Sequence, residues 1–384
     1  MIQTIARMSF TRRTFTRAIA GAAALTALPA VRAQGDRIVL GQSAPFTGPA
    51  AQLGIQFHAG ARLWFEQFNA QGGVQHRPIE LVKMDDGYEP ERCADNTRKL
   101  LADDPLALFA YVGTPTSLAA MPLASAARTP FIAPYTGAMG LREPFNRYAF
   151  HLRASYNDET AVIVKQLANL GLTKIAVFYQ NDAYGKAGLE GVQLALAAFN
   201  AKPVAVATVE RNSVDVAAAV KTLTAAAPDA IVQISAYKSC AAFIRQAKAA
   251  GYGGTFHNVS FVGTQALADE LGKDAAGVVV SQVVPSPYNN ARPIAREFNE
   301  AVKKAGGEYQ ANFSSMEGYI AAKVVTEGLR RAGAKPTRES LVTALEGLGS
   351  QALGGFNITL APNDHSASKF VELSMLTGDG RVRT

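Results

Sequence analysis

Short apolar runs alternate with longer amphipathic segments through the first half of the chain. Leu106–Val112 has the length of a buried strand, whereas Gln52–Ala70 repeats its apolar residues at helical spacing. The predicted strands are Arg37–Ser43, Pro78–Met84, Leu106–Val112 and Phe131–Ala133, and the predicted helices are Gln52–Ala70, Glu91–Ala102 and Ser117–Ala127. This alternation predicts a parallel sheet covered by helices.

The same alternation restarts in the second half. The predicted strands are Lys174–Tyr179, Val204–Val209, Asp229–Ile234, Phe256–Val262 and Gly277–Val283, and the predicted helices are Glu159–Leu170, Gly188–Phe199, Val214–Ala226 and Ala241–Ala250. Two α/β units of similar length therefore follow one another, although no sequence repeat relates them.

From Val284 onward the pattern is mainly helical. The helices are Arg292–Ala305, Ser314–Ala332 and Thr337–Gly347, and a last strand is Lys369–Leu376. Helices without strands of their own need a sheet to pack on. We therefore expect residues 285–360 to return to the first unit and the last strand to join the second, with crossings near 153–156, 284–287 and 360.

Hydroxyl residues follow two neighbouring strand ends in the stretch Pro105–Gly137. Thr114, Thr116 and Ser117 come after the first of these strands, at the start of a helix, and Tyr135-Thr136-Gly137 comes after the second. Free backbone N–H groups, the positive end of the helix and the hydroxyls would converge there and bind an anion. The simpler alternative is that residues 114–117 only cap the helix.

The first 33 residues have the pattern of a secretory signal. Met1–Arg17 holds four arginines and no acid, Ala18–Ala30 is small and apolar, and Val31-Arg32-Ala33 offers a small-residue cleavage site. Thr11-Arg12-Arg13-Thr14-Phe15 also resembles a twin-arginine signal. We therefore expect an exported protein cleaved near Ala33. No later stretch approaches the roughly 18 continuous apolar residues of a membrane span.

The leader accounts for much of the net charge of +7 among the 384 residues. It holds five basic and no acidic groups, so its removal leaves 33 basic against 31 acidic residues, a charge of +2. We infer no nucleic-acid partner from that balance. Cys93 and Cys240 lie in different predicted units and within helical patterns, so we expect buried free thiols rather than a disulfide.

Candidate catalytic and metal-binding chemistry is sparse. Five histidines are scattered without an HExxH, GxSxG, Walker lysine or CxxC motif, so the sequence indicates neither an enzyme nor a cofactor. Asp85-Asp86 follows a strand without a nearby third ligand, which favours a capping or turn role over a metal site.

Several segments along the chain form a recognisable set. They are GQSAPFTGPAAQLG (Gly41–Gly54), FNAQGGVQHRP (Phe68–Pro78), Val112–Ser117, Pro130–Gly137, VFYQNDAYG (Val177–Gly185), Ser235–Tyr237, FIRQAKAAG (Phe243–Gly251) and MEGYIAAK (Met316–Lys323). Together they resemble one known family, the type I periplasmic solute-binding proteins of ABC importers, in their leucine/isoleucine/valine-binding branch. The order and spacing of these segments, from about Asp36 to the C-terminus, carry the resemblance.

The resemblance implies an α/β fold of two doubly wound, Rossmann-like lobes joined by a three-crossover hinge. Residues 34–154 plus 285–360 would form the N-terminal lobe, and residues 155–284 plus 361–384 the C-terminal lobe. The lobes would close over a small ligand. The resemblance also implies a periplasmic monomer that delivers its ligand to an inner-membrane ABC permease.

The resemblance further places candidate ligand-binding residues on both lobes. Thr114 matches the hydroxyl that holds the ligand carboxylate, and Thr116 is its near neighbour. Tyr135, Thr136 and Gly137 match a loop that contacts the carboxylate and the ammonium. The remaining matches are Tyr184 as an aromatic lid, Tyr237 as the tyrosine that closes from the second lobe, and Leu53 where the family often has an aromatic contact.

Ser260 departs from the family pattern, because amino-acid binders carry a carboxylate at this position to pair with the ligand ammonium. Burying an unpaired cation is costly. Either another acid substitutes or the ligand lacks an ammonium. Glu317 is the best substitute and Asp158 a weaker one, while the alternative for Glu317 is a solvated helix residue.

Three functions follow from the resemblance and the departure at Ser260. The first is an importer's binding protein for a branched-chain or other apolar amino acid. The second keeps the mechanism with an aromatic or aliphatic acid, or an amide, as ligand. The third is a ligand sensor, which the sequence does not separate from a transport protein.

Overall fold

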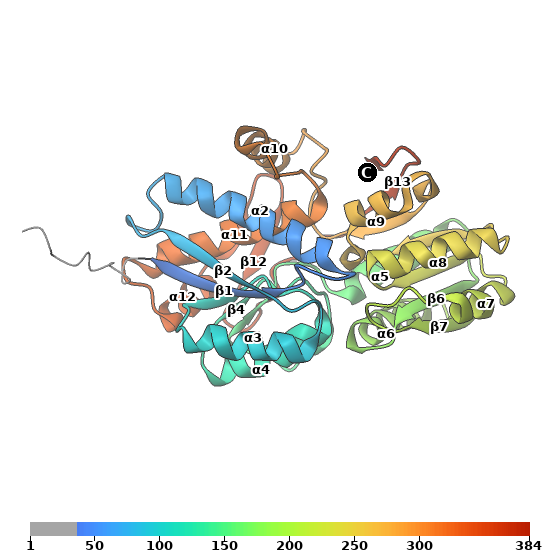
Figure 1. The fold of residues 1–384 in the computed structure, drawn as a ribbon, viewed down its shortest axis with the longest axis horizontal. Helices are drawn as coiled ribbons and strands as arrows, with labels where there is room; N and C mark the ends of the chain where they lie inside the picture. The colour runs from blue at the N-terminus through green and yellow to red at the C-terminus, as the bar shows by residue number, and fades with distance from the viewer. Residues whose placement is uncertain (1–36) are drawn as a thin grey trace, which may run out of the picture. The chain divides into compact units, whose positions relative to one another are not determined.

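The computed structural model describes residues 37–384, and Ile38–Thr384 form one compact unit. The predicted leader lies outside the described residues. Within the described part, two separate sheets each carry their own helices (Figure 1). We call them the first-sheet unit and the second-sheet unit.

The first sheet has five parallel strands in the order β2-β1-β3-β4-β5. Its elements are β1 (Ile38–Ala44), α2 (Ala51–Ala70), β2 (Ile79–Asp85), α3 (Pro90–Ala102), β3 (Ala107–Phe109), α4 (Thr114–Ala126), β4 (Phe131–Ile132), the 3-10 turn η1 (Met139–Leu141) and β5 (Ala149–Phe150). The alternation predicted from the sequence is therefore present, with β5 as a short additional strand.

The second sheet has seven strands in the order β14-β13-β10-β9-β8-β6-β7. Its elements before the second crossing are α5 (Tyr156–Asn169), β6 (Ile175–Gln180), α6 (Ala183–Ala197), β7 (Ala205–Val209), α7 (Ala217–Ala225), β8 (Ala230–Ile234), α8 (Tyr237–Ala249), β9 (Thr255–Asn258), η2 (Ser260–Val262), α9 (Thr264–Leu271), η3 (Gly272–Ala275) and β10 (Val279–Gln282). Five of its strands are parallel, and β13 (Glu372–Leu376) pairs antiparallel with β10, followed by β14 (Val382–Arg383).

The C-terminal helices pack on the first-sheet unit. They are α10 (Pro293–Ala305), α11 (Phe313–Ala332) and α12 (Arg338–Glu346), followed by the hairpin β11 (Gly349–Ala352) and β12 (Asn357–Leu360). Helix α11 lies along α2 (Figure 1). A Cβ on Gly60 would overlap the carbonyl of Ser315, and one on Gly318 would overlap that of Phe57. Glycine on both helices thus allows the backbones of α2 and α11 to pack in direct contact, which holds the C-terminal helices on the first-sheet unit.

The chain leaves the first-sheet unit for the last time after Ala367, later than the expected 360. His151 beside β5 donates its backbone N–H to His365, and Ala367 donates to His151, so residues 365–367 continue along the edge of the first sheet. The ring of His365 also stacks on Phe150, with centroids 4.0 Å apart. These contacts hold the third crossover beside the first.

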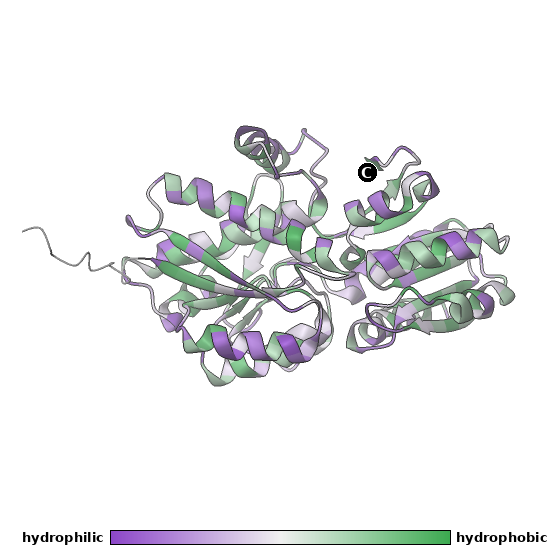
Figure 2. Ribbon diagram, viewed as in Figure 1, coloured by the Kyte–Doolittle hydropathy of each residue, from purple (hydrophilic) through white to green (hydrophobic). Residues whose placement is uncertain are grey.

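Hydrophobic residues concentrate in the strands and along the inward sides of the helices (Figure 2). The main core is one contiguous cluster that includes buried residues of both units, such as Phe109, Tyr135, Tyr184 and Phe261. A smaller cluster lies under α3 and α4 and contains Cys93. Cys93 and Cys240 are both free and buried, as the sequence predicted.

Candidate functional site

The β3–α4 connection is one side of the candidate site. Gly113 precedes α4 with φ +100°, and a Cβ there would overlap the Tyr88 ring. Helix α4 begins at Thr114, three residues earlier than predicted, because Pro115 is well suited to a first helical turn. The early start places Thr114 and Thr116 in the first turn of α4, where backbone N–H groups lack intrahelical acceptors.

A chain of three hydroxyls crosses this connection. Thr114 Oγ1 and Thr136 Oγ1 lie 2.6 Å apart, and Thr136 Oγ1 donates to the Tyr156 hydroxyl at 3.2 Å. Because Thr136 has one hydrogen to donate, Thr114 donates to Thr136, and the Tyr156 hydrogen is left to point elsewhere. We call Thr114, Thr136 and Tyr156 the hydroxyl chain.

Thr116 and Gly137 support this arrangement through the backbone. The Thr116 hydroxyl lies 2.5 Å from the carbonyl of Val112 and 3.0 Å from that of Gly113, so its hydrogen is used within the helix start. Gly137 accepts the backbone N–H of Tyr156 at 2.8 Å, and a Cβ on it would lie 2.7 Å from that nitrogen.

Five aromatic rings from both units meet beside the hydroxyl chain. Phe261 of η2 is central, with ring centroids 4.5 Å from Tyr184, 5.6 Å from Tyr135 and 5.9 Å from Tyr88. Tyr156 lies 5.4 Å from Tyr184. All five are at least 98% buried, and the Tyr184 hydroxyl makes no hydrogen bond within residues 37–384. We call these residues the aromatic cluster.

Arg153 contacts Tyr135 of the aromatic cluster and pairs with Glu317. Its Nε and Nη2 atoms donate to the two Glu317 oxygens, both at 2.8 Å, and its guanidinium lies 4.1 Å from the centre of the Tyr135 ring. Both side chains are buried, and Arg153 Nη1 has no hydrogen-bond partner among the described residues. The sequence proposed Glu317 as a ligand contact, and in the structure both of its oxygens are occupied by Arg153.

A second buried carboxylate, Glu159, lies at Ser260. Ser260 donates to it from its backbone N–H at 2.7 Å and from its hydroxyl at 3.0 Å, and Ser281 donates at 2.5 Å. Burial raises the pKa of Glu159, while nearby Arg153 and these hydrogen bonds lower it. A carboxylate from α5 therefore occupies the neighbourhood of Ser260, where the sequence itself has no charge.

Asp158, the weaker sequence candidate, has a structural role. It forms a capping box with Ser155, whose hydroxyl accepts the Asp158 N–H while the carboxylate accepts the Ser155 N–H. The sequence prediction began this helix at Glu159 and so left Tyr156 outside it, and neither Tyr156 nor Glu159 was among the candidate ligand-binding residues. The Ser155-x-x-Asp158 pattern was the available signal, because such a pair marks a helix start.

Leu53 and Tyr237 lie at other contacts between the two units. A Cβ on Gly263, before α9, would lie 2.5 Å from a Leu53 methyl group of α2, so the two approach closely. Burial raises the pKa of Tyr237, opposed by a hydrogen bond with the backbone of Gln52. The structure thus brings both residues against the opposite unit without linking them to the hydroxyl chain.

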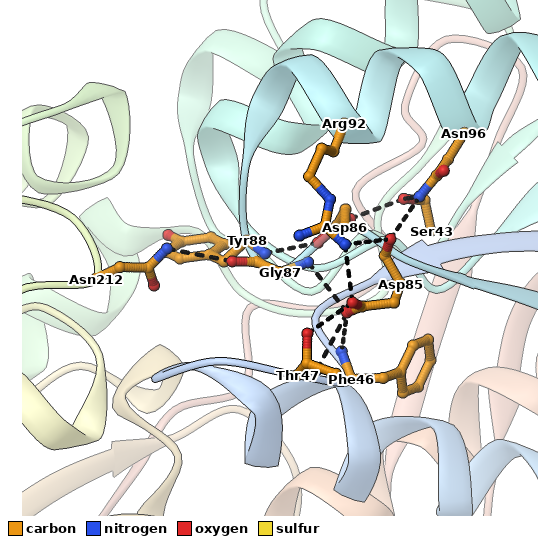
Figure 3. A network of polar contacts seen from close by, with 10 residues as sticks. All are labelled: Ser43, Phe46, Thr47, Asp85, Asp86, Gly87, Tyr88, Arg92, Asn96 and Asn212. Carbon is orange, nitrogen blue, oxygen red and sulfur yellow. Dashed lines mark hydrogen bonds and ion pairs between the residues drawn. The ribbon is translucent and has the colours of Figure 1, made fainter.

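The carboxylates of Asp85 and Asp86 build a turn (Figure 3). Burial alone would raise the pKa of Asp85, but hydrogen bonds from Thr47, Phe46 and Gly87 lower it to about 2. Asp86 accepts from the Ser43 hydroxyl and the Tyr88 N–H, both at 2.8 Å, and burial raises its pKa to about 6. Residues 37–384 contain no group of three or more His, Cys, Asp or Glu side chains arranged for a metal ion.

Similarity to known proteins identifies the family of this chain. The sequence profile of the periplasmic binding protein family matches residues 37–380. The chain belongs to this family. Members of the family are periplasmic binding proteins rather than enzymes. Among the described residues, no helix combines the length and apolar character needed to cross a bilayer.

Relatives resemble this binding protein along nearly its whole length. Leu/Ile/Val-binding protein homolog 7 of Brucella suis biovar 1 (strain 1330) is 26% identical over 368 residues, with 90% of each chain covered. A possible leucine/isoleucine/valine-binding protein from Rhodopirellula baltica SH 1 is 33% identical, with a TM-score of 0.85 over 91% of this chain and 96% of that one. The predicted fold class, the type I periplasmic-binding-protein architecture, is confirmed.

The fold alone does not select the ligand. A fatty acid ABC transporter substrate-binding protein from Thermomonospora curvata has a TM-score of 0.83 at 21% identity, with 91% of each chain covered. At that identity the likeness concerns the fold only. The choice of ligand must therefore be argued from the side chains of the site itself.

Proposed function

We propose that this chain is the substrate-binding component of an ABC importer and holds an apolar amino acid between its two units. Residues 34–154 with 285–367 and residues 155–284 with 368–384 would act as the two lobes, which moves the last boundary expected from the sequence from 360 to Ala367. Export through the leader, cleavage near Ala33 and delivery to an inner-membrane permease belong to the same proposal. The names of the leucine/isoleucine/valine-binding relatives support it.

One observation carries the proposal: an anion-binding group and a buried carboxylate border the same aromatic cluster. Tyr156 and Glu159 lie in the first turn of α5, and Ser260, which binds Glu159, is adjacent to Phe261. The Tyr156 hydroxyl and the N–H groups at the start of α4 suit a ligand carboxylate. The rings suit an apolar side chain.

The buried charges favour a ligand that also carries a cation. Glu317 and Arg153 neutralise one another, whereas the groups that donate hydrogen bonds to Glu159 are all neutral. An ammonium near Glu159 would be paired on binding, whereas an isolated buried carboxylate is costly. Glu159 would then fulfil the role for which the sequence suggested Glu317.

An acid without an ammonium is the second candidate, and one observation favours it. The Glu159 oxygens already accept three hydrogen bonds, and burial raises the pKa of this group. If Glu159 is protonated inside the protein, no cation is needed to balance it. The two candidates therefore differ in the charge state of one residue.

A thermal-shift screen of residues 34–384 tests both candidates. Leucine, isoleucine and valine are compared with acids of the same carbon skeleton that lack the ammonium, because a ligand that binds only the folded state raises Tm. A shift with the amino acids alone supports the amino-acid proposal. A shift with the acids alone supports the second candidate, and no shift with any of them contradicts both.

Two variants connect the screen to the site. Thr114→Val removes the first hydroxyl of the chain and should weaken binding of any carboxylate. Its matched control is Thr97→Val, a buried threonine whose hydroxyl binds Tyr111 away from the aromatic cluster. Equal affinity of the Thr114→Val variant and wild type, measured by calorimetry, would exclude the hydroxyl chain as the carboxylate site.

A further inference from the structure

The turn after β2 reaches across to the second-sheet unit. Asn212, in the loop that follows β7, donates its Nδ2 hydrogens to the backbone carbonyl of Gly87 at 3.2 Å and to Glu89 Oε1 at 2.8 Å (Figure 3 shows the Gly87 bond). Asn212 itself has a positive φ of 61°, a conformation that asparagine tolerates better than most residues. The Asn212 side chain is thus held toward the turn by a left-handed backbone conformation of its own loop.

Hydrogen bonds within the first-sheet unit hold the conformation of this turn, independently of Asn212. Gly87 and Tyr88 have φ values of +59° and +66°, and each donates its backbone N–H to the preceding aspartate pair. Asp85 also accepts from Arg92 at 2.9 Å, which ties the turn to α3. A positive φ at a tyrosine is costly, so these bonds hold a conformation that the chain would not adopt freely.

Further polar contacts reinforce the junction. Gln180, at the end of β6, donates to the Tyr88 hydroxyl at 3.3 Å and to Asp182 at 2.5 Å. Arg211 lies 3.9 Å from Glu89 of the first-sheet unit and 3.9 Å from Asp182 of the second. Its single positive charge therefore faces one carboxylate from each side.

We propose that Asn212 and the turn 85–89 form a latch that sets how long a ligand is retained between the two units. None of the latch side chains other than Tyr88 belongs to the hydroxyl chain or the aromatic cluster. The latch contacts can form only when the two units touch. They therefore stabilise the closed arrangement of the units relative to an open one. The latch rests on the proposed binding function, because retention presumes a ligand.

The test compares two asparagines with the same chemistry. Asn181 donates Nδ2 to Glu210 Oε1 at 2.8 Å, the distance of the Asn212–Glu89 bond, but both partners lie in the second-sheet unit. With leucine as the probe, or whichever acid of the screen binds, Asn212→Ala should release the ligand about 3- to 10-fold faster, with an unchanged association rate. Asn181→Ala should behave as wild type. Equal dissociation rates for the two variants overturn the latch.

A double-mutant cycle tests the pairing itself. Glu89→Ala should also speed release, and the combined variant should release the ligand more slowly than the product of the two single effects predicts, because the two substitutions share the Asn212–Glu89 bond while Asn212 also binds Gly87 and Glu89 also faces Arg211. Glu89→Gln keeps an oxygen acceptor for Asn212 and should retain more of the effect. Fully additive rates would contradict a direct Asn212–Glu89 latch.

A ligand-free readout separates this inference from the proposed function. If none of the screened compounds binds, the proposed function fails, and small-angle scattering then judges the latch alone. Asn212→Ala should give a larger radius of gyration than wild type and Asn181→Ala. Identical radii in the three proteins overturn the latch.

Discussion

Replacing Glu317 by glutamine should destabilise the ligand-free protein strongly. Arg153 is 1% exposed and Glu317 is 6% exposed, and two hydrogen bonds of 2.8 Å join them. Glutamine keeps one acceptor oxygen but removes the charge, so the guanidinium remains buried with a neutral partner. Removing one member of a buried ion pair typically costs about 3–5 kcal/mol.

The expected loss is large enough to measure directly. For a chain of this length, the unfolding entropy is on the order of 0.7 kcal/mol per kelvin, so a loss of about 4 kcal/mol lowers Tm by roughly 5 °C. The double variant Arg153→Met, Glu317→Leu should recover much of the loss, because it buries no unpaired charge. The sign of this recovery distinguishes an unpaired charge from general damage to the core.

The assay is thermal and chemical unfolding without ligand, with Glu327→Gln as the matched control. Glu327 lies on the same helix and pairs with Arg330 and Arg331 at the surface, where such pairs contribute about 0–1 kcal/mol. A Glu317→Gln protein as stable as the Glu327→Gln control would refute the argument that Glu317 serves Arg153.

Two further predictions concern single sites. Gly113→Ala should lose about 2–4 kcal/mol by urea unfolding, because φ is +100° and the added Cβ overlaps Tyr88, whereas Gly171→Ala at φ +74° meets no atom within 4 Å and should lose less. Burial lowers the pKa of His257 from 6.5 to about 4, so its contribution to stability is present above pH 6.5 and is lost as pH falls toward 4. His257→Gln should therefore flatten the decline of Tm across that interval, and an unchanged slope would contradict this assignment.

Local patterns were sufficient to predict most of the architecture. Alternating apolar runs and amphipathic segments predicted the strands and helices of both sheets, because each element needs an apolar face of the right period to reach a core. The helix boundaries were less accurate where capping decided them. Helices α4 and α5 both begin three residues earlier than predicted. The additional residues include Thr114 and Thr116 in α4 and Tyr156 in α5.

The candidate site was only partly accessible to sequence reasoning. The hydroxyls of Thr114 and Thr136 follow parallel strand ends that meet at one edge, so their proximity could be predicted. The Glu317–Arg153 pair spans 164 residues, and the Glu159–Ser260 contact spans 101. No local spacing encodes which side chain faces each carboxylate across such separations, since that depends on how helices from different segments pack.

The two α/β units, the return of the C-terminal helices and the hydroxyl-rich strand ends follow from the amino-acid sequence, because these features depend on local periodicity and turn chemistry. Which carboxylate is paired with Arg153 and which lies beside Ser260 follows only from the packing of the folded chain. That packing also decided that Asn212 meets the turn 85–89. Charges separated by a hundred residues acquire their roles only when burial brings them together and removes the water that would otherwise screen them.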